Sequence, residues 1–522
     1  MPLSALVAAV PLVLLLVLMG GLRKSGSLSA AWGLATTLAI AVAIWRMPPK
    51  LALWSVAYGF VYGLWPIMWV VFTALWLYNL TVDTRKFELL RDWMAEHASG
   101  DPRIQAILVG FCFGALLEGT AGFGTPVAVA AYLLLGLGFS ARKAVTVSLI
   151  ANTAPVAFGG LGIPIIALAG VTGLDQMKLS AMVGRQLPFM SLMLPAYLVW
   201  VVDGRKGLRE TWPAAVVSGA SFALAQFTVS NVWGPYVADV LSALTSIAAL
   251  VLFLRVWKPP AATADPAKLT GSVPGAATLS RADVFFAWAP WVLLTAVMIA
   301  WSALKLFQVG QVTVPVPQLH NAIFITLYRK AYAAIYQFQP LAAGTAALTT
   351  TLVVALLFRA GLRTFARSGL KTLRQLRMPG LTVGMIVALA YLYNYSGMAY
   401  TLGAALASLG GLFPLVSGFL GWVACFLSGS DTASNLLFGN LQVAVANQIH
   451  VNPILLAATN SSGAVTGKMI SPQNIAVGVT TVGLVGKEGE VVRTTFWHSI
   501  LLALGLSTLA FAQAYGLKWM VP

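Results

Sequence analysis

The chain has 522 residues, of which 59% are hydrophobic and only 9% are charged, far below the roughly 25% charged residues of a soluble domain. Apolar stretches long enough to cross a membrane as a helix recur from end to end, and continuously apolar runs such as 6–18 and 247–254 exclude the alternating pattern of a porin-like barrel. The net charge of +17 indicates cytoplasmic loops rich in Lys and Arg rather than a nucleic-acid-binding domain, because no groove-reading motif accompanies it. The lipid bilayer is therefore the first expected partner, and no nucleic acid is expected.

In chain order, hydrophobic periodicity predicts an all-α polytopic protein with about twelve transmembrane spans, two of them broken by small and polar residues. The expected spans are 4–22, 27–45, 65–82, 144–176 (broken), 180–202, 212–230, 236–256, 284–306, 340–358, 380–400, 450–480 (broken) and 496–518. Two further apolar stretches, 103–139 and 411–447, are interrupted near their middle and are interpreted as re-entrant hairpins.

Charge distribution predicts the orientation of these spans. With the basic segment 359–377 placed in the cytoplasm as an amphipathic surface helix, 24 of the 32 Lys and Arg residues fall inside, and both termini lie outside. The expected parts are an extra N-terminal helix 1–26, a first inverted repeat 27–202, connecting helices 203–306 with a cytoplasmic linker 258–280, an extracytoplasmic loop 307–338, and a second inverted repeat 339–522.

Internal repetition supports this division. The tripeptide Leu-Tyr-Asn at 77–79 recurs at 392–394, and each copy precedes a hairpin that carries one carboxylate, Glu118 in the first and Asp431 in the second. A polar cluster then follows at nearly the same distance in both halves, and the topology gives the halves opposite orientations. Inverted repeats of this kind are typical of secondary transporters.

Glu118 and Asp431 lie in otherwise apolar segments. Intramembrane carboxylates are costly and commonly mark ion or proton pathways, so we expect both to take part in proton coupling. The alternative is that each carboxylate caps a broken helix by accepting backbone N–H bonds.

The hairpin tips have the composition of a binding site. The first tip is rich in glycine, which suits binding of an anion at unwound backbone. The second tip is rich in hydroxyl and amide side chains, which suits a hydroxyl-bearing ligand. The alternative is that these small residues only permit close packing of helices. The expected binding residues of the tips are Gly119, Thr120, Gly122, Gly124, Ser428, Ser430, Thr432, Ser434 and Asn435.

Further candidates come from the two broken spans, whose polar residues are expected to interrupt the helices in mid-membrane. They are Asn152, Thr153, Asn460, Ser461, Ser462, Lys468 and Gln473. Lys468 is the expected partner of a substrate carboxylate or of Asp431; alternatively it extends to the cytoplasmic headgroups without a ligand.

The sequence gives no support for enzymatic activity or for ATP-driven transport. The four histidines are scattered without metal-ligand spacing, no phosphate-binding loop is present, and the two cysteines lie in apolar segments. We therefore expect no cofactor, no metal and no enzyme activity.

The run Leu-Glu-Gly-Thr-Ala-Gly-Phe-Gly-Thr-Pro-Val-Ala at 117–128 closely resembles the signature of the bacterial L-lactate permease family. The segments 467–476 and 483–488 are similar to that family's C-terminal signature, and Gly-Arg-Gln-Leu-Pro at 184–188 also fits. Outside the segments around 258–280 and 307–338, the resemblance covers most of the chain.

The resemblance implies import of L-lactate and related 2-hydroxy monocarboxylates, including glycolate and D-lactate, by proton symport across the bacterial cytoplasmic membrane. It also implies a distant similarity to transporters in which hairpins slide past a scaffold, here 27–64, 212–256, 284–306 and 340–378, in an elevator-like motion. An anion channel or a sodium-coupled carboxylate carrier of the same architecture stays open as an alternative, as do lactate or glycolate preference and the existence of a homo-oligomer.

Overall fold

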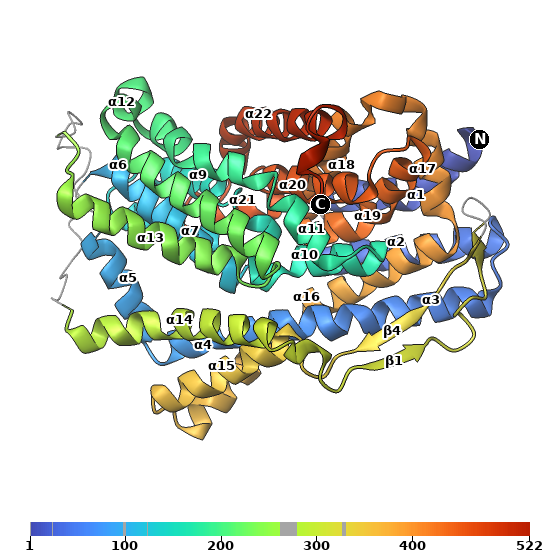
Figure 1. Ribbon diagram of the computed structural model, residues 1–522, viewed down its shortest axis with the longest axis horizontal. Helices are drawn as coiled ribbons and strands as arrows, with labels where there is room; N and C mark the ends of the chain where they lie inside the picture. The colour runs from blue at the N-terminus through green and yellow to red at the C-terminus, as the bar shows by residue number, and fades with distance from the viewer. Residues whose placement is uncertain (1, 23, 98–100, 123, 261–278, 326–329) are drawn as a thin grey trace.

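The computed structural model describes residues 2–522 except 23, 98–100, 123, 261–278 and 326–329. The described chain is predominantly helical (Figure 1). Nine of its helices are long and apolar enough to cross a membrane, or ten when a bent pair is taken as one span. The protein is therefore a polytopic helical membrane protein, as predicted, but the expected count of twelve spans is not confirmed. Most of the predicted linker 258–280 lies outside the described residues.

The helices that precede the first hairpin pack partly against the second half of the chain. They are α1 (Pro2–Leu16), α2 (Gly26–Ala43), α3 (Pro49–Tyr62), α4 (Trp69–Asp83) and α5 (Lys86–His97). Helix α16 (Leu362–Tyr395) runs along α2, α3 and α4, so the N-terminal segment and the middle of the chain form one group. The basic segment 359–377, expected as a separate surface helix, is instead mostly the first part of α16, because its helical sequence runs without a break into the following apolar stretch.

The first hairpin and the segment that follows it are built from short helices. They are α6 (Pro102–Gln105), a π-helical stretch Ala106–Phe113, α7 (Gly114–Thr120), α8 (Thr125–Gly136), α9 (Ala141–Ala151), a 3-10 turn Val156–Phe158, α10 (Gly159–Thr172) and α11 (Gln176–Val183). Helices α9 and α10 meet at a bend of 64°, which agrees with the predicted break in the span 144–176.

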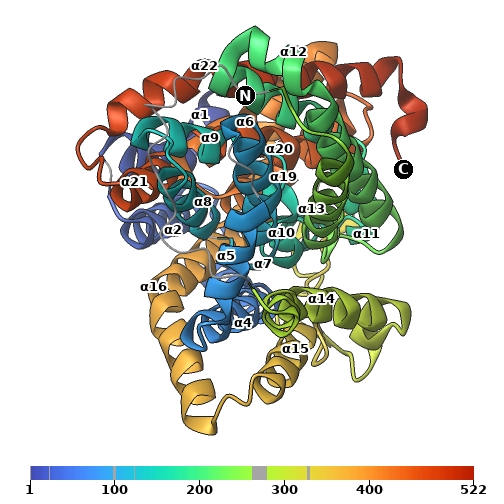
Figure 2. The ribbon, with the colours of Figure 1, turned by 90° about the vertical axis from the view of Figure 1, so that its left-hand side faces the viewer.

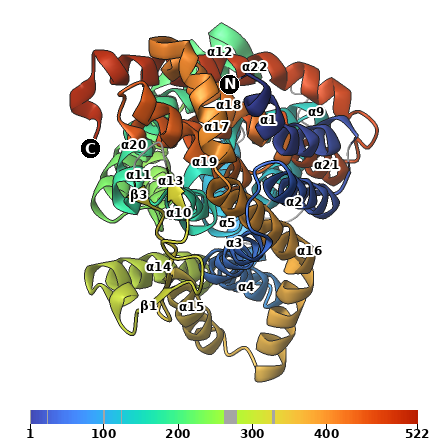
Figure 3. The same ribbon diagram turned by 90° about the vertical axis from the view of Figure 1, so that its right-hand side faces the viewer.

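The connecting helices are α12 (Leu187–Val232), α13 (Ala238–Val256) and α14 (Arg281–Ala303). The spans expected at 180–202 and 212–230 belong to one helical run, interrupted in its backbone at Gly204. Helices α12 and α13 pack against the first hairpin, whereas α14 packs on α15 (Ala343–Leu357). Figures 2 and 3 show α4, α14 and α15 on one side of the molecule, away from α20 and α22. The division into sliding and static parts stays a prediction.

A buried guanidinium ties the first hairpin to α12. Arg103, whose side chain is 1% exposed, pairs with Asp101 at 2.6 Å, with Asp203 at 3.5 Å and with Glu210. It also donates to the carbonyl of Pro260 at 2.9 Å. One side chain thus joins the start of the hairpin, α12 and the segment after α13.

The predicted loop 307–338 contains strand structure that helical patterning did not anticipate. Strand β1 (Val312–Pro315) pairs antiparallel with β4 (Ile335–Phe338), and β2 (Phe324–Ile325) with β3 (Lys330–Ala331). The paired strands β1 and β4 lie against α3, where Tyr58 donates to the carbonyl of Ile335 at 2.8 Å.

The second half of the chain continues after α16; that it forms an inverted repeat of the first half stays a prediction. It comprises α17 (Met398–Leu406), a 3-10 stretch Ala407–Leu412, α18 (Phe413–Ser428), α19 (Asp431–Gln448), α20 (Pro453–Lys468), α21 (Pro472–Thr481), α22 (Glu488–Tyr515) and a 3-10 turn Lys518–Met520. The asparagines of the repeated tripeptide both bond to the other half, Asn79 to the hydroxyl of Thr372 at 2.8 Å and Asn394 to the carbonyl of Val171 at 3.2 Å.

Candidate functional site

The first hairpin tip turns because its glycines adopt backbone conformations that other residues rarely take. Helix α7 ends at Thr120, Gly122 and Gly124 have φ of +53° and +83°, and α8 begins at Thr125 with a proline in its first turn. Gly124 precedes α8, and among the described residues no side chain accepts a capping hydrogen bond from the first N–H groups of this helix.

The second tip is tighter and is capped by its own side chains. Helix α18 ends at Gly429, whose φ is +70°. Ser430 then caps α19 by accepting from the N–H of Ala433 at 3.3 Å, and Asp431 is the first residue of that helix. Ser428 donates to the carbonyl of Ala424 at 2.7 Å. Helix–break–helix tips thus occur at both predicted places; that they re-enter the membrane stays a prediction.

The break in the second polar cluster lies later than predicted. Residues 460–463 were expected to interrupt the span, but α20 continues through them to Lys468, and the chain turns at 469–471. The helix continues because the side-chain amide of Asn460 is occupied by α19, donating to Asn435 at 3.0 Å and accepting from Gln442 at 3.2 Å. Ser471 then caps α21 through the N–H of Asn474 at 3.2 Å.

Glu118 and Lys468 form a buried ion pair between the two halves. The Lys468 Nζ lies 2.8 Å from Glu118 Oε1, and the side chains are 8% and 4% exposed. The Nδ2 of Asn152 donates to the other Glu118 oxygen at 3.1 Å. Lys468 was expected to pair with a substrate carboxylate or with Asp431, or to reach the headgroups. Its side chain is enclosed and pairs with Glu118; that it binds a substrate carboxylate stays a prediction.

Asp431 occupies the equivalent position at the second tip. It is 2% exposed, and its Oδ2 accepts from the hydroxyl of Ser461 at 2.7 Å. Its Oδ1 has no hydrogen-bond partner among the described residues. Each tip carboxylate therefore bonds to a polar residue of the following polar cluster, Asn152 for Glu118 and Ser461 for Asp431.

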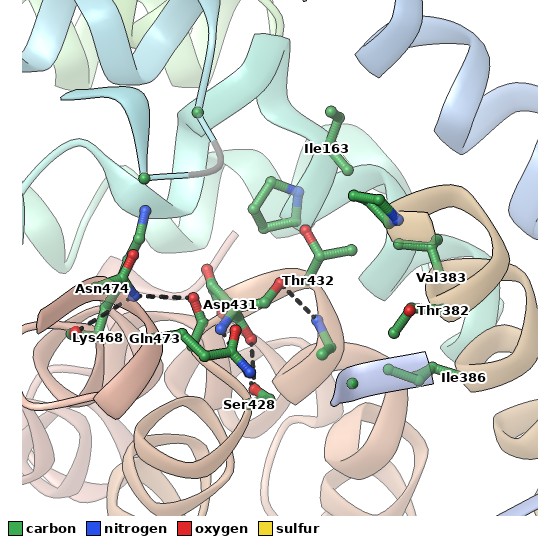
Figure 4. Close-up of a pocket in the computed structure, with 18 of the residues that line it drawn as sticks. Ile163, Thr382, Val383, Ile386, Ser428, Asp431, Thr432, Lys468, Gln473 and Asn474 are labelled. Atoms are coloured by element: carbon green, nitrogen blue, oxygen red, sulfur yellow. Dashed lines mark hydrogen bonds between the residues drawn. The ribbon is translucent and has the colours of Figure 1, made fainter. Parts of the chain in front are cut away.

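A cavity of about 540 Å³ lies between the tips, and residues of both halves line it (Figure 4). Its size is within the usual range for small-molecule sites. The sequence-predicted residues that line it are Glu118, Gly122, Gly124, Ser428, Ser430, Asp431, Thr432, Lys468 and Gln473. Figure 4 shows Asp431, Thr432, Lys468 and Gln473 grouped on one wall, opposite Ile163, Val383 and Ile386.

The other predicted binding residues do not line the cavity. They are Gly119, Thr120, Asn152, Thr153, Ser434, Asn435, Asn460, Ser461 and Ser462. Several already bond within the protein: Thr120 donates to the carbonyl of Leu116, Ser434 to that of Gly421, and Asn435 to that of Pro164. Asn152 and Ser461 lie one layer behind the cavity, where they bond to Glu118 and Asp431.

Two residues of the region were not singled out from the sequence. Asn474 lines the cavity and donates to the carbonyl of Gly429 at 3.1 Å, which fixes α21 to the second tip. Asp239 is 1% exposed, in the first turn of α13. Its signal was present, since a carboxylate stands among Val237, Ala238 and Val240, but its place at the end of the predicted span 236–256 did not distinguish it from other acidic residues.

Comparison with known proteins identifies the family. The family described as L-lactate permease matches residues 4–517. The chain belongs to the L-lactate permease family. It is 42% identical to the glycolate permease GlcA of Escherichia coli K12, over 98% of this chain and 96% of that protein. It is also 42% identical to the L-lactate permeases of Escherichia coli K12 and Bacillus subtilis 168, over 100% of this chain and 97% of each relative.

As a member of this family, the chain is a multi-pass membrane permease and not an enzyme. Among solved structures, the YdaH transporter of Alcanivorax borkumensis is similar with a TM-score of 0.45 and 15% identity, over 87% of this chain and 86% of that one. Among the described residues, no group of three or more His, Cys, Asp and Glu side chains could hold a metal ion.

Proposed function

We propose that this permease imports L-lactate and related 2-hydroxy monocarboxylates, such as glycolate and D-lactate, by proton symport. The buried ion pair of Glu118 and Lys468 in the cavity wall is the observation that carries the proposal. The names of the relatives, which include lactate and glycolate permeases, support the substrate class.

The substrate carboxylate binds to the Lys468 ammonium and the adjacent start of α8. The ammonium is a strong donor, and the N-terminal end of α8 carries partial positive charge with no side chain capping it. By contrast, α19 and α21 are already capped by Ser430 and Ser471. An anion is therefore best stabilised on the Gly124 side of the cavity.

The substrate hydroxyl binds at the second tip. The free Oδ1 of Asp431 accepts its proton in a hydrogen bond, and the cavity-lining hydroxyls of Ser430 and Thr432 supply further partners. A site built to bond a hydroxyl discriminates against an analogue that lacks it, because its buried polar groups are then left without partners.

Proton coupling follows from the charges of the site. When the substrate carboxylate takes Lys468, Glu118 loses its counter-ion and would remain as an unpaired buried charge, which is strongly unfavourable. Protonation of Glu118 removes this cost. One proton then enters with each substrate anion, and the net charge of the site is unchanged.

The test is uptake into proteoliposomes under an imposed pH gradient. We expect labelled L-lactate to accumulate when the outside is acidic and the accumulation to collapse with a protonophore. Uptake that ignores the protonophore but requires sodium would overturn the proton assignment, and absence of counterflow exchange would point to a channel. Propionate should compete poorly with glycolate; equal competition would remove the argued role of the second tip.

A further inference from the structure

A third carboxylate lies directly behind the first hairpin tip, outside the cavity lining. Asp239 belongs to the first turn of α13, and α13 packs on α7 at the residue that follows Glu118. A Cβ added to Gly119 would lie 2.9 Å from the Cβ of Asp239 and 3.0 Å from the backbone N of Val240. The glycine thus allows α13 to approach the tip closely.

Asp239 has no bond that would stabilise its ionised form. It is 1% exposed, and neither carboxylate oxygen has a hydrogen-bond partner among the described residues. An isolated buried carboxylate is far more costly than a neutral carboxylic acid. Lys468 is already engaged by Glu118, so burial without a partner favours the neutral acid form of Asp239.

Few charged groups lie near Asp239. Among the described residues, Glu118 of α7 and Lys468 of α20 act on it electrostatically. Of the other elements packed against α13, α10 and the π-helical stretch Ala106–Phe113 contain no charged residue.

The remaining neighbours carry their charged and titratable groups elsewhere. Those of α12 are Tyr197, which bonds to His498 of α22, and the charged residues within 203–210. The latter lie near the segment that follows the C-terminal end of α13, as the shared contact of Glu210 and Pro260 with Arg103 shows. Those of α14 are Arg281 and Asp283 at its start. The thiol of Cys112, on the stretch Ala106–Phe113, contacts serine hydroxyls of α12 and α13.

We propose that Asp239 is a proton-binding residue of the transport cycle, which supplies Glu118 with its proton when the substrate displaces Glu118 from Lys468. The O–H bond of the Asp239 carboxylic acid breaks, and the proton is bound by a Glu118 carboxylate oxygen. A proton from water replaces it on Asp239 as it leaves, so no isolated carboxylate charge remains behind the tip. The balance is one proton taken up for each substrate anion bound. This inference rests on the proposed proton symport.

The test separates proton coupling from folding and from substrate binding. In proteoliposomes, Asp239→Asn should retain lactate counterflow within about twofold of the wild type and lose pH-driven accumulation at least tenfold. The matched control is Ser242→Ala, which removes a buried polar group one turn along α13 that bonds only to the carbonyl of Ala238; it should keep both activities.

Each result bears on the inference. Normal pH-driven accumulation in Asp239→Asn would overturn it. If the wild type itself shows no proton-driven accumulation, the proposed symport fails instead. If Asp239→Asn does not fold, Asp239→Glu decides: it keeps a carboxyl but moves it, so the pH profile of uptake should shift by at least half a unit, and an unchanged profile would refute the role.

Discussion

Replacing Lys468 by Met tests the ion pair on which the proposed mechanism depends. The two side chains are 8% and 4% exposed and lie 2.8 Å apart. Removing one partner of a buried pair costs about 3–5 kcal/mol, because the other charge stays buried without compensation. We expect Lys468→Met and Glu118→Gln each to lower the free energy of unfolding by this amount. The double variant should recover much of the loss, because neither charge then remains.

Thermal unfolding of the purified variants in one detergent measures this double-mutant cycle. A second lysine–carboxylate pair, Lys371 with Asp83 at 2.6 Å, is 48% and 22% exposed and gives the control. Pairs exposed to this degree contribute about 0–1 kcal/mol, so Lys371→Met should change little. If the losses of the two single site variants simply add in the double variant, the reasoning is refuted.

Two further changes test features around the site. Gly124→Ala should lower the free energy of unfolding by about 1–3 kcal/mol and abolish uptake, since Gly124 has φ of +83°. The control is Gly136→Ala, where an added Cβ meets nothing within 4 Å, and it should preserve uptake. Equal uptake by the two variants would contradict the argument. Arg103→Met should destabilise the protein by about 3–5 kcal/mol, because it removes the buried guanidinium that pairs with Glu210. Arg91→Met, which breaks a pair that is 39% and 42% exposed, should have almost no effect in the same melting assay.

The hairpin tips were predictable because local composition determines them. Glycines that must take positive φ, followed by Thr125 and Pro126, stop one helix and start the next wherever they occur. The interruption of the span 144–176 was predictable for the same reason: the bend lies at 152–155, and beyond it Gly160 and Gly162, inside α10, have φ of +52° and +77°.

The partners within the site were not predictable, because they depend on packing between distant segments. Glu118 and Lys468 are 350 residues apart, and no local pattern relates them. Likewise, the position of the break after α20 depends on side chains of α19 that satisfy the amide of Asn460. Asp239 was overlooked because burial, not residue type, distinguishes it from the acidic residues of loops.

The separation of Glu118 from Lys468 also affects biosynthesis. At a translation rate of roughly 5–20 residues per second, the 350 residues between them take roughly 20–70 s to synthesise. Throughout that interval the first hairpin exists without its cation. The nascent chain must keep Glu118 either hydrated or protonated until α20 arrives, so the final closure of this hairpin waits for the last quarter of the protein to be inserted.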